Sequence, residues 1–141
     1  MRGEIAHEVL QGKDAAMVLK NYGQEDPLGD KARKLTEVRE RFLSTPLMRD
    51  AVVDRKEQAF EIVLDGRVCI GRMDRLVRTK DGQWYLVDFK TGMVSRSRAK
   101  EKVKEHAPQM VIYRRAAESI VGHPVRSMIY FTDGGFFEEV R

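Results

Sequence analysis

The sequence predicts one mixed α/β domain (α+β, with a mixed sheet) in which helices pack on a central β-sheet. Helical patterns occupy the first third of the chain, three strand-like runs follow in succession, and a long helical pattern precedes two more strand-like runs. The 141 residues are 42% hydrophobic and 34% charged, which is the composition of a globular protein with a normal core. Residues 1–141 are therefore expected to form a single domain.

The helical patterns come first. An apolar stripe that includes Ile5 and Val9 indicates a helix at the N-terminus. Asp30 is expected to cap a charged helix that ends before Pro46. The expected segments are a helix over 4–20, a loop over 21–29, a helix over 31–44 and a short helical turn within 47–53.

Strand-like runs dominate the rest of the chain. Asp65-Gly66 is a tight-turn signal between the first two runs, and Gly122 followed by Pro124 ends the long helix. The expected elements are strands over about 57–64, 67–78 and 83–90, a helix over about 97–121, and strands over 125–131 and 136–140. The order is thus helix, helix, three antiparallel strands, long helix, strand, strand.

The hairpin over residues 71–90 carries most of the chemical information. Lys80-Asp81-Gly82 can form a type I turn with Gly82 in the left-handed position. In that register Thr79 faces Gln83, and Asp74 consequently faces Asp88. Their Cβ atoms would then lie about 5 Å apart.

The same register places Arg72 opposite Lys90. Because side chains alternate along a strand, Asp88 and Lys90 share a face, and Asp74 joins them on it. Two carboxylates this close repel unless a cation lies between them. A hard divalent ion such as Mg²⁺ prefers oxygen ligands of this kind, and a nearby lysine suits hydrolysis of a phosphodiester.

A solvated sheet face with ordinary surface charges is the simpler alternative for this hairpin. Leu86 and Val87 precede Asp88 and Phe89 follows it, which indicates a largely buried strand. Ionised groups in such a strand need a partner or a metal. The burial pattern therefore favours a site over a solvated face.

The composition argues against disulfides, cysteine-based metal sites and membrane-spanning segments. Cys69 is the single cysteine, which rules out an intramolecular disulfide and an iron–sulfur or four-cysteine zinc site within this chain. Because Cys69 lies in an apolar run, we expect it in the core. No apolar run is long enough to span a membrane, and residues 1–20 lack a signal-peptide pattern. We expect an intracellular, cytoplasmic protein with no membrane partner.

Positive charge gathers directly after the acidic hairpin. The net charge is +4 and the pI about 9.3. The cations of this stretch are Arg96, Arg98, Lys100, Lys102 and Lys104. An ordinary solvated helix face is one interpretation of this stretch. A surface that contacts DNA phosphates beside a metal site is the other, and Arg96, Arg98 and Lys102 are its candidate substrate-binding residues.

Four motifs together resemble a known family. They are Gly3-x-x-x-His7, Gly71-x-x-Asp74-Arg75, Val87-Asp88-Phe89-Lys90-Thr91-Gly92 and Gln109-x-x-x-Tyr113. The chain resembles the RecB-like exonuclease family of the PD-(D/E)XK nuclease superfamily over nearly its whole length. Its Tyr130-Phe131 strand and Gly134-Gly135 turn are similar to the end of the C-terminal nuclease domain of AddA-type helicase–nucleases. The resemblance implies a restriction-endonuclease-like core.

The resemblance also implies roles for individual residues. Asp74 and Asp88 look like the metal-binding carboxylates, the backbone carbonyl of Phe89 like a further ligand, and His7 like the ligand that completes the site. The family often has Tyr where this chain has Phe89, a mild change because the carbonyl is the ligand. Lys90 looks like the residue that orients or deprotonates the attacking water.

Other residues have weaker motif support. Gln109 and Tyr113, one helical turn apart, look like the substrate-side pair of the family, and Glu57 resembles an acidic position on the first strand. Each of these, like His7, has an ordinary structural interpretation when taken alone. His106 and His123 match no motif and are expected to be structural.

The implied function is metal-dependent exonuclease cleavage of DNA with Mg²⁺ or Mn²⁺, in double-strand-break processing and recombinational repair. The expected partners are DNA, a helicase domain in cis and a second nuclease subunit. No Gly-x-x-x-x-Gly-Lys-Ser/Thr loop occurs, so the chain is not itself an ATP-driven motor. Its start, six residues before His7, suggests an excised domain or a small stand-alone member.

Two alternatives remain open at this point. The first is a catalytically silent nuclease-fold module that binds DNA or a partner subunit. The second is a structure-specific or restriction endonuclease on the same fold. The presence of both motif acids and the motif lysine argues against the silent module, and the histidine and Gln/Tyr motifs argue against the second alternative.

Overall fold

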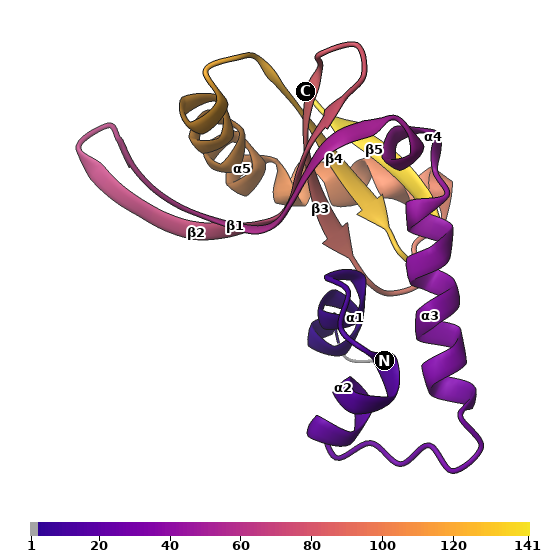
Figure 1. The fold of residues 1–141 in the computed structure, drawn as a ribbon. Helices are drawn as coiled ribbons and strands as arrows, with labels where there is room; N and C mark the ends of the chain where they lie inside the picture. The colour runs from indigo at the N-terminus through magenta and orange to yellow at the C-terminus, as the bar shows by residue number, and fades with distance from the viewer. Residues whose placement is uncertain (1–2) are drawn as a thin grey trace.

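The computed structural model describes residues 3–141. In chain order the elements are α1 (Gly3–Leu10), α2 (Ala15–Asn21), α3 (Asp30–Leu43), α4 (Pro46–Arg49), β1 (Ala51–Leu64), β2 (Arg67–Thr79), β3 (Trp84–Lys90), α5 (Arg96–Val121), β4 (Val125–Phe131) and β5 (Phe136–Val140). α1, α2 and the start of α3 form one end of the molecule, and the sheet with α5 forms the other (Figure 1).

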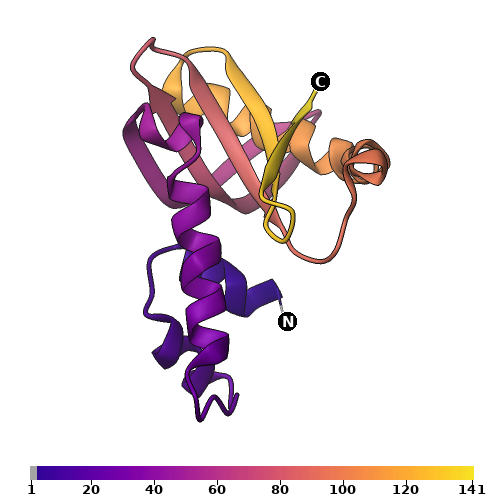
Figure 2. The same cartoon turned by 90° about the vertical axis from the view of Figure 1, so that its right-hand side faces the viewer.

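The five strands form one mixed sheet in the order β1-β2-β3-β4-β5. β3 and β4 are parallel, and every other neighbouring pair is antiparallel. Parallel neighbours need a crossover connection, which α5 supplies. α5 covers one face of the sheet and the end of α3, with α4, lies on the other (Figure 2). The predicted α/β fold with a mixed sheet and packed helices is confirmed.

Apolar packing divides into three clusters. Between the sheet and α5 lie side chains such as Leu86 and Met110. On the opposite face, Phe42 of α3 packs edge-on against Phe89 of β3, with ring centroids 4.9 Å apart. The third cluster joins α1, α2 and α3, with Val18 among its buried members. Within residues 3–141, the helices are all too short or too polar to cross a membrane.

The expected helix over 4–20 is wrong as a single element. The structure breaks it into α1 and α2 at Gly12, whose φ of 103° is outside the helical range. Asp14 then starts α2, because its carboxylate accepts a hydrogen bond from the Met17 N–H at 3.1 Å. The apolar stripe continues across this break because α1 and α2 share one buried cluster with α3.

The predicted capping role of Asp30 is also wrong. Gly29 is the N-cap of α3, and Asp30 is its first helical residue. The carboxylate of Asp26 instead accepts hydrogen bonds from the N–H groups of Lys31 and Ala32, each at 3.0 Å. The preceding loop folds back onto the helix start, which the local sequence pattern does not reveal.

Strand β1 begins at Ala51, six residues before the expected start. The expected turn within 47–53 is the single-turn helix α4, which ends at Arg49. Residues 54–57 are charged and exposed, so they lack the apolar alternation of a half-buried strand. They form an edge strand against β2, and exposed edges commonly carry charged residues.

The register of the β2–β3 hairpin is confirmed only near its turn. The Thr79 N–H donates to the Gln83 carbonyl at 3.0 Å, and pairing runs as far as Arg75 opposite Val87. Beyond that pair the two strands separate. Among the residues that the structure describes, Arg72 has no partner in β3 and pairs only with Ala59 of β1, so its expected position opposite Lys90 is wrong. β2 follows β1 away from the sheet, because those two strands remain paired along their whole length.

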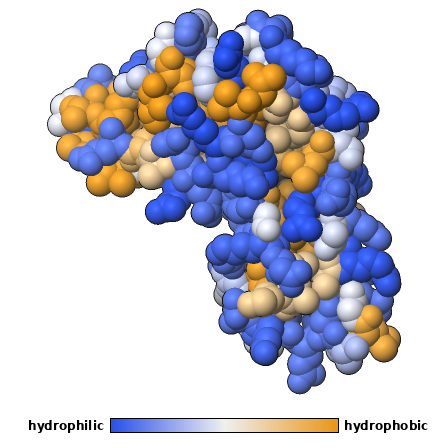
Figure 3. Space-filling view, in the orientation of Figure 1, coloured by the Kyte–Doolittle hydropathy of each residue, from blue (hydrophilic) through white to orange (hydrophobic). Residues whose placement is uncertain are grey.

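Residues 59–72, here called the arm, project from the molecule as a two-stranded hairpin (Figure 1). Apolar side chains are exposed on it (Figure 3), among them Val63, Val68 and Ile70. Cys69 lies in the arm and is half-buried, so its expected core position is wrong. Its apolar run reflects strand pairing in the arm rather than burial in the core.

The second half of the chain follows the prediction closely. α5 begins at Arg96, one residue before the expected start, and ends at Val121 with Gly122 as its C-cap. β4 and β5 have the expected bounds. β3 is buried along most of its length, as expected from its apolar residues, and lies at the centre of the sheet.

Candidate active site

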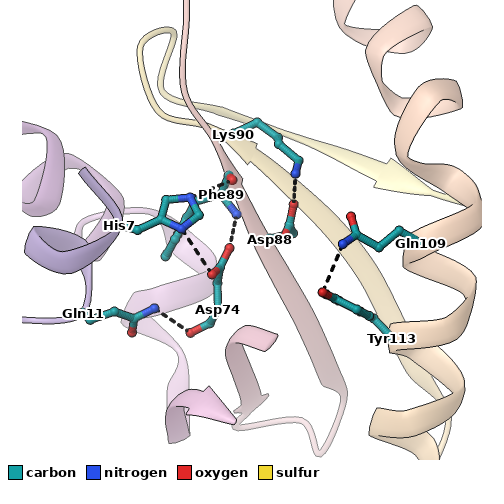
Figure 4. A network of polar contacts seen from close by, with 8 residues as sticks. All are labelled: His7, Gln11, Asp74, Asp88, Phe89, Lys90, Gln109 and Tyr113. Carbon is teal, nitrogen blue, oxygen red and sulfur yellow. Dashed lines mark hydrogen bonds and ion pairs between the residues drawn. The ribbon is translucent and has the colours of Figure 1, made fainter. Parts of the chain in front are cut away.

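Asp88 and Lys90 lie at the end of β3, on the side that faces α5. Asp88 is 7% exposed, and the Lys90 Nζ lies 3.1 Å from its Oδ2 (Figure 4). That oxygen is buried and takes part in no hydrogen bond, because the ammonium meets it outside hydrogen-bond geometry. A buried carboxylate oxygen with only an ion-pair neighbour retains capacity for a further cation.

Asp74 lies where β2 and β3 separate. Its Oδ2 accepts a hydrogen bond from the Phe89 N–H at 2.8 Å, so its side chain replaces the backbone partner that β3 loses at this point. Burial, and next the nearby Asp88 carboxylate, raise the pKa of Asp74 to about 6. The two carboxylates are thus close, as the hairpin register predicts, although no backbone bridge joins their residues.

His7 of α1 approaches the same point from the other side of β3. Its Nε2 donates to the Phe89 carbonyl at 3.1 Å, and its Nδ1 lies 3.5 Å from the Asp74 Oδ1 (Figure 4). The structure therefore brings His7, Asp74, Asp88, Phe89 and Lys90 together from three separate elements.

Hydrogen bonds dock α1 and the residue after it against the sheet. The Gln11 Nε2 donates to the Asp74 carbonyl at 3.1 Å. The Arg75 side chain is 1% exposed and donates to the Leu10 carbonyl at 2.5 Å and to the Asp54 Oδ2 at 2.6 Å. A cation at the C-terminal end of α1 also complements the helix dipole. These contacts fix the helix that carries His7.

Two motif glycines have packing roles. A Cβ on Gly3 would lie 3.3 Å from the Thr91 Oγ1, so the small residue lets α1 approach the segment after β3. A Cβ on Gly71 would lie 2.7 Å from the Phe60 ring, which packs edge-on against Tyr113. Gly71 therefore makes room for the aromatic pair that supports α5.

Gln109 and Tyr113 lie on α5, across from β3. The Gln109 Nε2 donates to the Tyr113 hydroxyl at 3.0 Å, as expected for residues one turn apart (Figure 4). Within residues 3–141 neither side chain forms a hydrogen bond to β3, and the amide of Gln109 is exposed. The pair lines the open side of the site.

The cations of the basic stretch of α5 differ in what they contact. The Arg96 guanidinium packs over the Phe136 ring at 4.6 Å from its centroid. The Lys102 Nζ lies 3.4 Å from a Glu105 carboxylate oxygen, whereas Arg98 is exposed. Arg98 and Lys102 are thus more available to a ligand than Arg96, whose cation is engaged by an aromatic ring.

Glu57 lies between two paired positions of the β1–β2 ladder, across from Asp74. Its φ of 49° is left-handed, an uncommon conformation for a residue other than glycine. Its side chain is exposed. Backbone strain of this kind often occurs at functional sites, but the role of Glu57 stays a prediction.

Three contributors near the site were not predicted from the sequence. His106 lies on α5 within electrostatic range of Lys90 and Asp88, and burial, then Lys90, lower its pKa. Its position three residues before Gln109 could have indicated this location. Gln11 and Arg75 bond to backbone carbonyls, a contact for which a sequence pattern carries no signal. Arg75 belongs to the second motif, but the motif gave it no role.

A divalent cation fits the donor set, although the side-chain arrangement is not a closed metal cluster. Among residues 3–141, no group of three or more His, Cys, Asp or Glu side chains is spaced to hold an ion. The Asp88 carboxylate is held by Lys90, and that of Asp74 by the Phe89 N–H. Oxygen donors still predominate, and the buried Asp88 Oδ2 lacks a hydrogen bond. His7, Asp74, Asp88 and the Phe89 carbonyl would hold the ion.

Comparison with known proteins decides the family. The family model described as the PD-(D/E)XK nuclease superfamily matches residues 1–139. The chain belongs to this superfamily. The superfamily predicted from the four motifs is therefore confirmed, while the individual roles of Asp74, Asp88 and Lys90 within it stay predictions.

Two relatives with significant similarity are each named as a subunit of an ATP-dependent helicase/nuclease. The protein from Carboxydothermus hydrogenoformans is 39% identical over 62 residues, which cover 43% of this chain and 5% of the relative. The protein from Staphylococcus epidermidis is 32% identical over 81 residues, which cover 52% of this chain and 6% of the relative. The matched segments thus span about a twentieth of these relatives, whose names agree with the predicted AddA-type resemblance.

Proposed function

We propose that this PD-(D/E)XK chain is a metal-dependent DNA exonuclease that hydrolyses phosphodiester bonds. The observation that carries the proposal is the convergence of His7, Asp74, Asp88 and Lys90 at the end of one buried strand. A buried and a half-buried carboxylate, with a histidine and a lysine in contact with them, suit a divalent cation and a phosphate together.

Each residue has a distinct task in the proposed reaction. Asp74, Asp88, His7 and the Phe89 carbonyl hold Mg²⁺ or Mn²⁺. When bound, such an ion polarises the scissile phosphate and lowers the pKa of a coordinated water. Lys90 orients the attacking water, accepts its proton when the ammonium is deprotonated, and otherwise balances charge that develops on the phosphate.

The open side of the site suits the substrate strand. Gln109 and Tyr113 present an amide and a phenol toward β3 without bonding to it, and they can hydrogen-bond to DNA phosphates or bases. Arg98 and Lys102 extend the positive surface along α5, where they can contact further phosphates.

The biological setting proposed here is double-strand-break processing and recombinational repair within an ATP-dependent helicase–nuclease. The names of the two relatives support a helicase domain in cis. We further propose that residues 1–141 form one intracellular nuclease domain, and that a second nuclease subunit is a partner.

The test is Mg²⁺- or Mn²⁺-dependent cleavage of end-labelled linear DNA, with closed circular single-stranded DNA as a parallel substrate. Asp88→Asn should abolish cleavage, because it removes the charge of a metal-binding group while keeping its shape. Asp65→Asn is the matched control: it makes the same chemical change in the arm turn, where φ is 51° and Asn is well tolerated.

Cleavage of linear DNA by wild type and Asp65→Asn, but not by Asp88→Asn, supports the proposal. Cleavage of the circular substrate would replace the exonuclease assignment with an endonuclease. Equal activity of Asp88→Asn and wild type would refute the catalytic site. Metal-independent DNA binding without any cleavage would favour the catalytically silent module.

A further inference from the structure

A pocket of about 300 Å³ lies beside the candidate active site, on the side of β3 opposite α5. Thr91 and Gly92, which follow β3, line one part of it. Thr132 and Asp133, which follow β4, line another. The segment after β3 and the β4–β5 turn lie side by side, next to α1 and α3 (Figures 1 and 2).

The pocket occupies a position in the sheet that commonly binds ligands. β3 and β4 are parallel, and the pocket lies at the carboxyl ends of both. Ligands of open α/β sheets bind in crevices outside the carboxyl ends of the strands. Because Thr91 directly follows Lys90, and Ala6 of the lining directly precedes His7, the pocket adjoins the candidate active site through the backbone.

The floor of the pocket is apolar, and its rim is positively charged. Ala6, Leu35 and Val38 supply the apolar surface. Lys34 and Arg41 of α3 lie at the rim, and within residues 3–141 neither has a carboxylate within ion-pair distance. The Arg41 Nη2 donates to the carbonyls of Thr132 and Asp133, at 3.1 and 3.2 Å, which leaves its charge uncompensated.

Lys34 is the more accessible cation. Its side chain is exposed, and no hydrogen bond or ion pair of the described residues engages it. Asp133 is an acid in the lining, but two cations outweigh it. The pocket thus offers an apolar surface for a ring, the Thr91 hydroxyl for a polar edge and a net positive rim for a phosphate.

We propose that this pocket binds one nucleotide of the DNA strand next to the phosphate that is cleaved. The proposal rests on the proposed nuclease function, which brings a DNA strand to Lys90, and it adds a second contact site on the α3 side. The base lies against the apolar floor, and Lys34 and Arg41 face its phosphate.

The experiment is a titration of the chain with thymidine 5′-monophosphate in EDTA, followed by amide chemical shifts in NMR spectra. EDTA removes divalent ions, so binding does not depend on the metal site. We expect saturable shifts at Thr91, Gly92 and Thr132. Lys34→Glu should weaken this binding about tenfold, because an attraction to the phosphate becomes a repulsion.

Lys31→Glu is the matched control, since it makes the same charge change on the same helix outside the pocket lining. It should change the affinity less than twofold. The second readout is cleavage of single-stranded DNA, where Lys34→Glu should raise KM with little effect on kcat.

Equal nucleotide affinity of wild type and Lys34→Glu, or shifts confined to residues around Asp88, would overturn the pocket assignment. Loss of cleavage in Asp88→Asn together with an unchanged KM in Lys34→Glu would refute the pocket and retain the nuclease. Nucleotide binding that depends on Lys34, in a chain that cleaves no DNA, would retain the pocket as a nucleotide site and refute the nuclease function.

Discussion

The two sides of β3 differ in how they are built. Toward α1, hydrogen bonds join His7, Gln11 and Arg75 to backbone carbonyls, and the His7 ring also lies 3.5 Å from the Asp74 carboxylate. Toward α5, Gln109 bonds to Tyr113 within its own helix, and the Lys90 ammonium lies near a carboxylate of its own strand. One side is fixed before any ligand arrives, while the other keeps its polar groups available.

This difference matches two separate requirements of a metal-dependent nuclease. A metal site gains affinity when its ligands are held in position by surrounding hydrogen bonds. A substrate surface must let a DNA strand enter and leave, so its polar groups are better left without fixed protein partners. The α1 side therefore fixes His7 and Asp74 for the ion, whereas the α5 side, which also carries Asp88, suits DNA.

The largest expected effect separates catalysis from metal binding. Lys90→Ala should lower the single-turnover cleavage rate about 100-fold or more, because the reaction loses the group that orients water and balances charge. Calorimetric Mn²⁺ titration should show the ion still bound, since a charged lysine is no ligand. Lys80→Ala, an exposed lysine of the β2–β3 turn, is the control. If Lys90→Ala keeps full activity, Lys90 is a structural residue of the sheet.

The second prediction concerns the contacts that hold α1 against the sheet and their effect on stability and Mn²⁺ affinity. Arg75→Met should lower the free energy of unfolding by about 3 kcal/mol, because it leaves the buried Leu10 carbonyl and the Asp54 carboxylate without their partner. Mn²⁺ affinity should fall as well, since α1 carries His7. Urea unfolding measures the first effect, with the exposed Arg78→Met on the same strand as control. Unchanged Mn²⁺ affinity in a folded Arg75→Met variant would show that α1 is positioned by other contacts.

The third prediction compares one variant on each side of β3. Its effects are smaller, but each should change only one property, either Mn²⁺ affinity or KM for DNA. His7→Ala should weaken Mn²⁺ binding about 10- to 100-fold. Gln109→Ala should leave Mn²⁺ affinity unchanged and raise KM for DNA about fivefold, the value of one hydrogen bond. Calorimetry and steady-state kinetics on both variants test this division. The division fails if Gln109→Ala weakens Mn²⁺ binding as much as His7→Ala does.

The smallest expected effect lies along α5. Reversing both Arg98 and Lys102 to Glu should reduce the slope of log affinity against log salt for single-stranded DNA by about 1.4, roughly 0.7 per phosphate contact. Reversing Lys20 and Arg33 changes the net charge equally in the N-terminal helices and is the control. Equal slopes for the two double variants would identify the α5 stretch as an ordinary solvated helix face.

The sequence predicted the elements that have strong local signals. α5, β4 and β5 have periodic apolar patterns, and glycines follow α5 and separate β4 from β5. The bounds of these elements agree with the prediction to within one residue. The break at Gly12, the capping of α3 by Asp26 and the early start of β1 were missed. The first two depend on local hydrogen bonds of the turns, which apolar periodicity does not report. The third depends on pairing with the distant strand β2.

Within the candidate site, positions set by the hairpin were likewise predictable from the sequence, whereas contacts between separate elements were not. Alternation and register indicated that Asp74, Asp88 and Lys90 lie together, and the structure agrees. The approach of His7 was expected only from the family resemblance, because no local pattern relates α1 to β3. The docking role of Arg75 was not predictable, since its partner at Leu10 is a backbone carbonyl that every residue possesses.

The most direct test of the two-sided site is a crystal structure of the chain with Mn²⁺, using anomalous scattering to locate the ion. The account predicts one strong peak within about 2.3 Å of oxygen atoms from Asp74, Asp88 and the Phe89 carbonyl, with the His7 ring also in contact. Lys90, Gln109 and Tyr113 should contribute no ligand. A peak without His7 in contact, or no peak at saturating Mn²⁺, would contradict the assignment of the metal to a site shared by α1 and the end of β3.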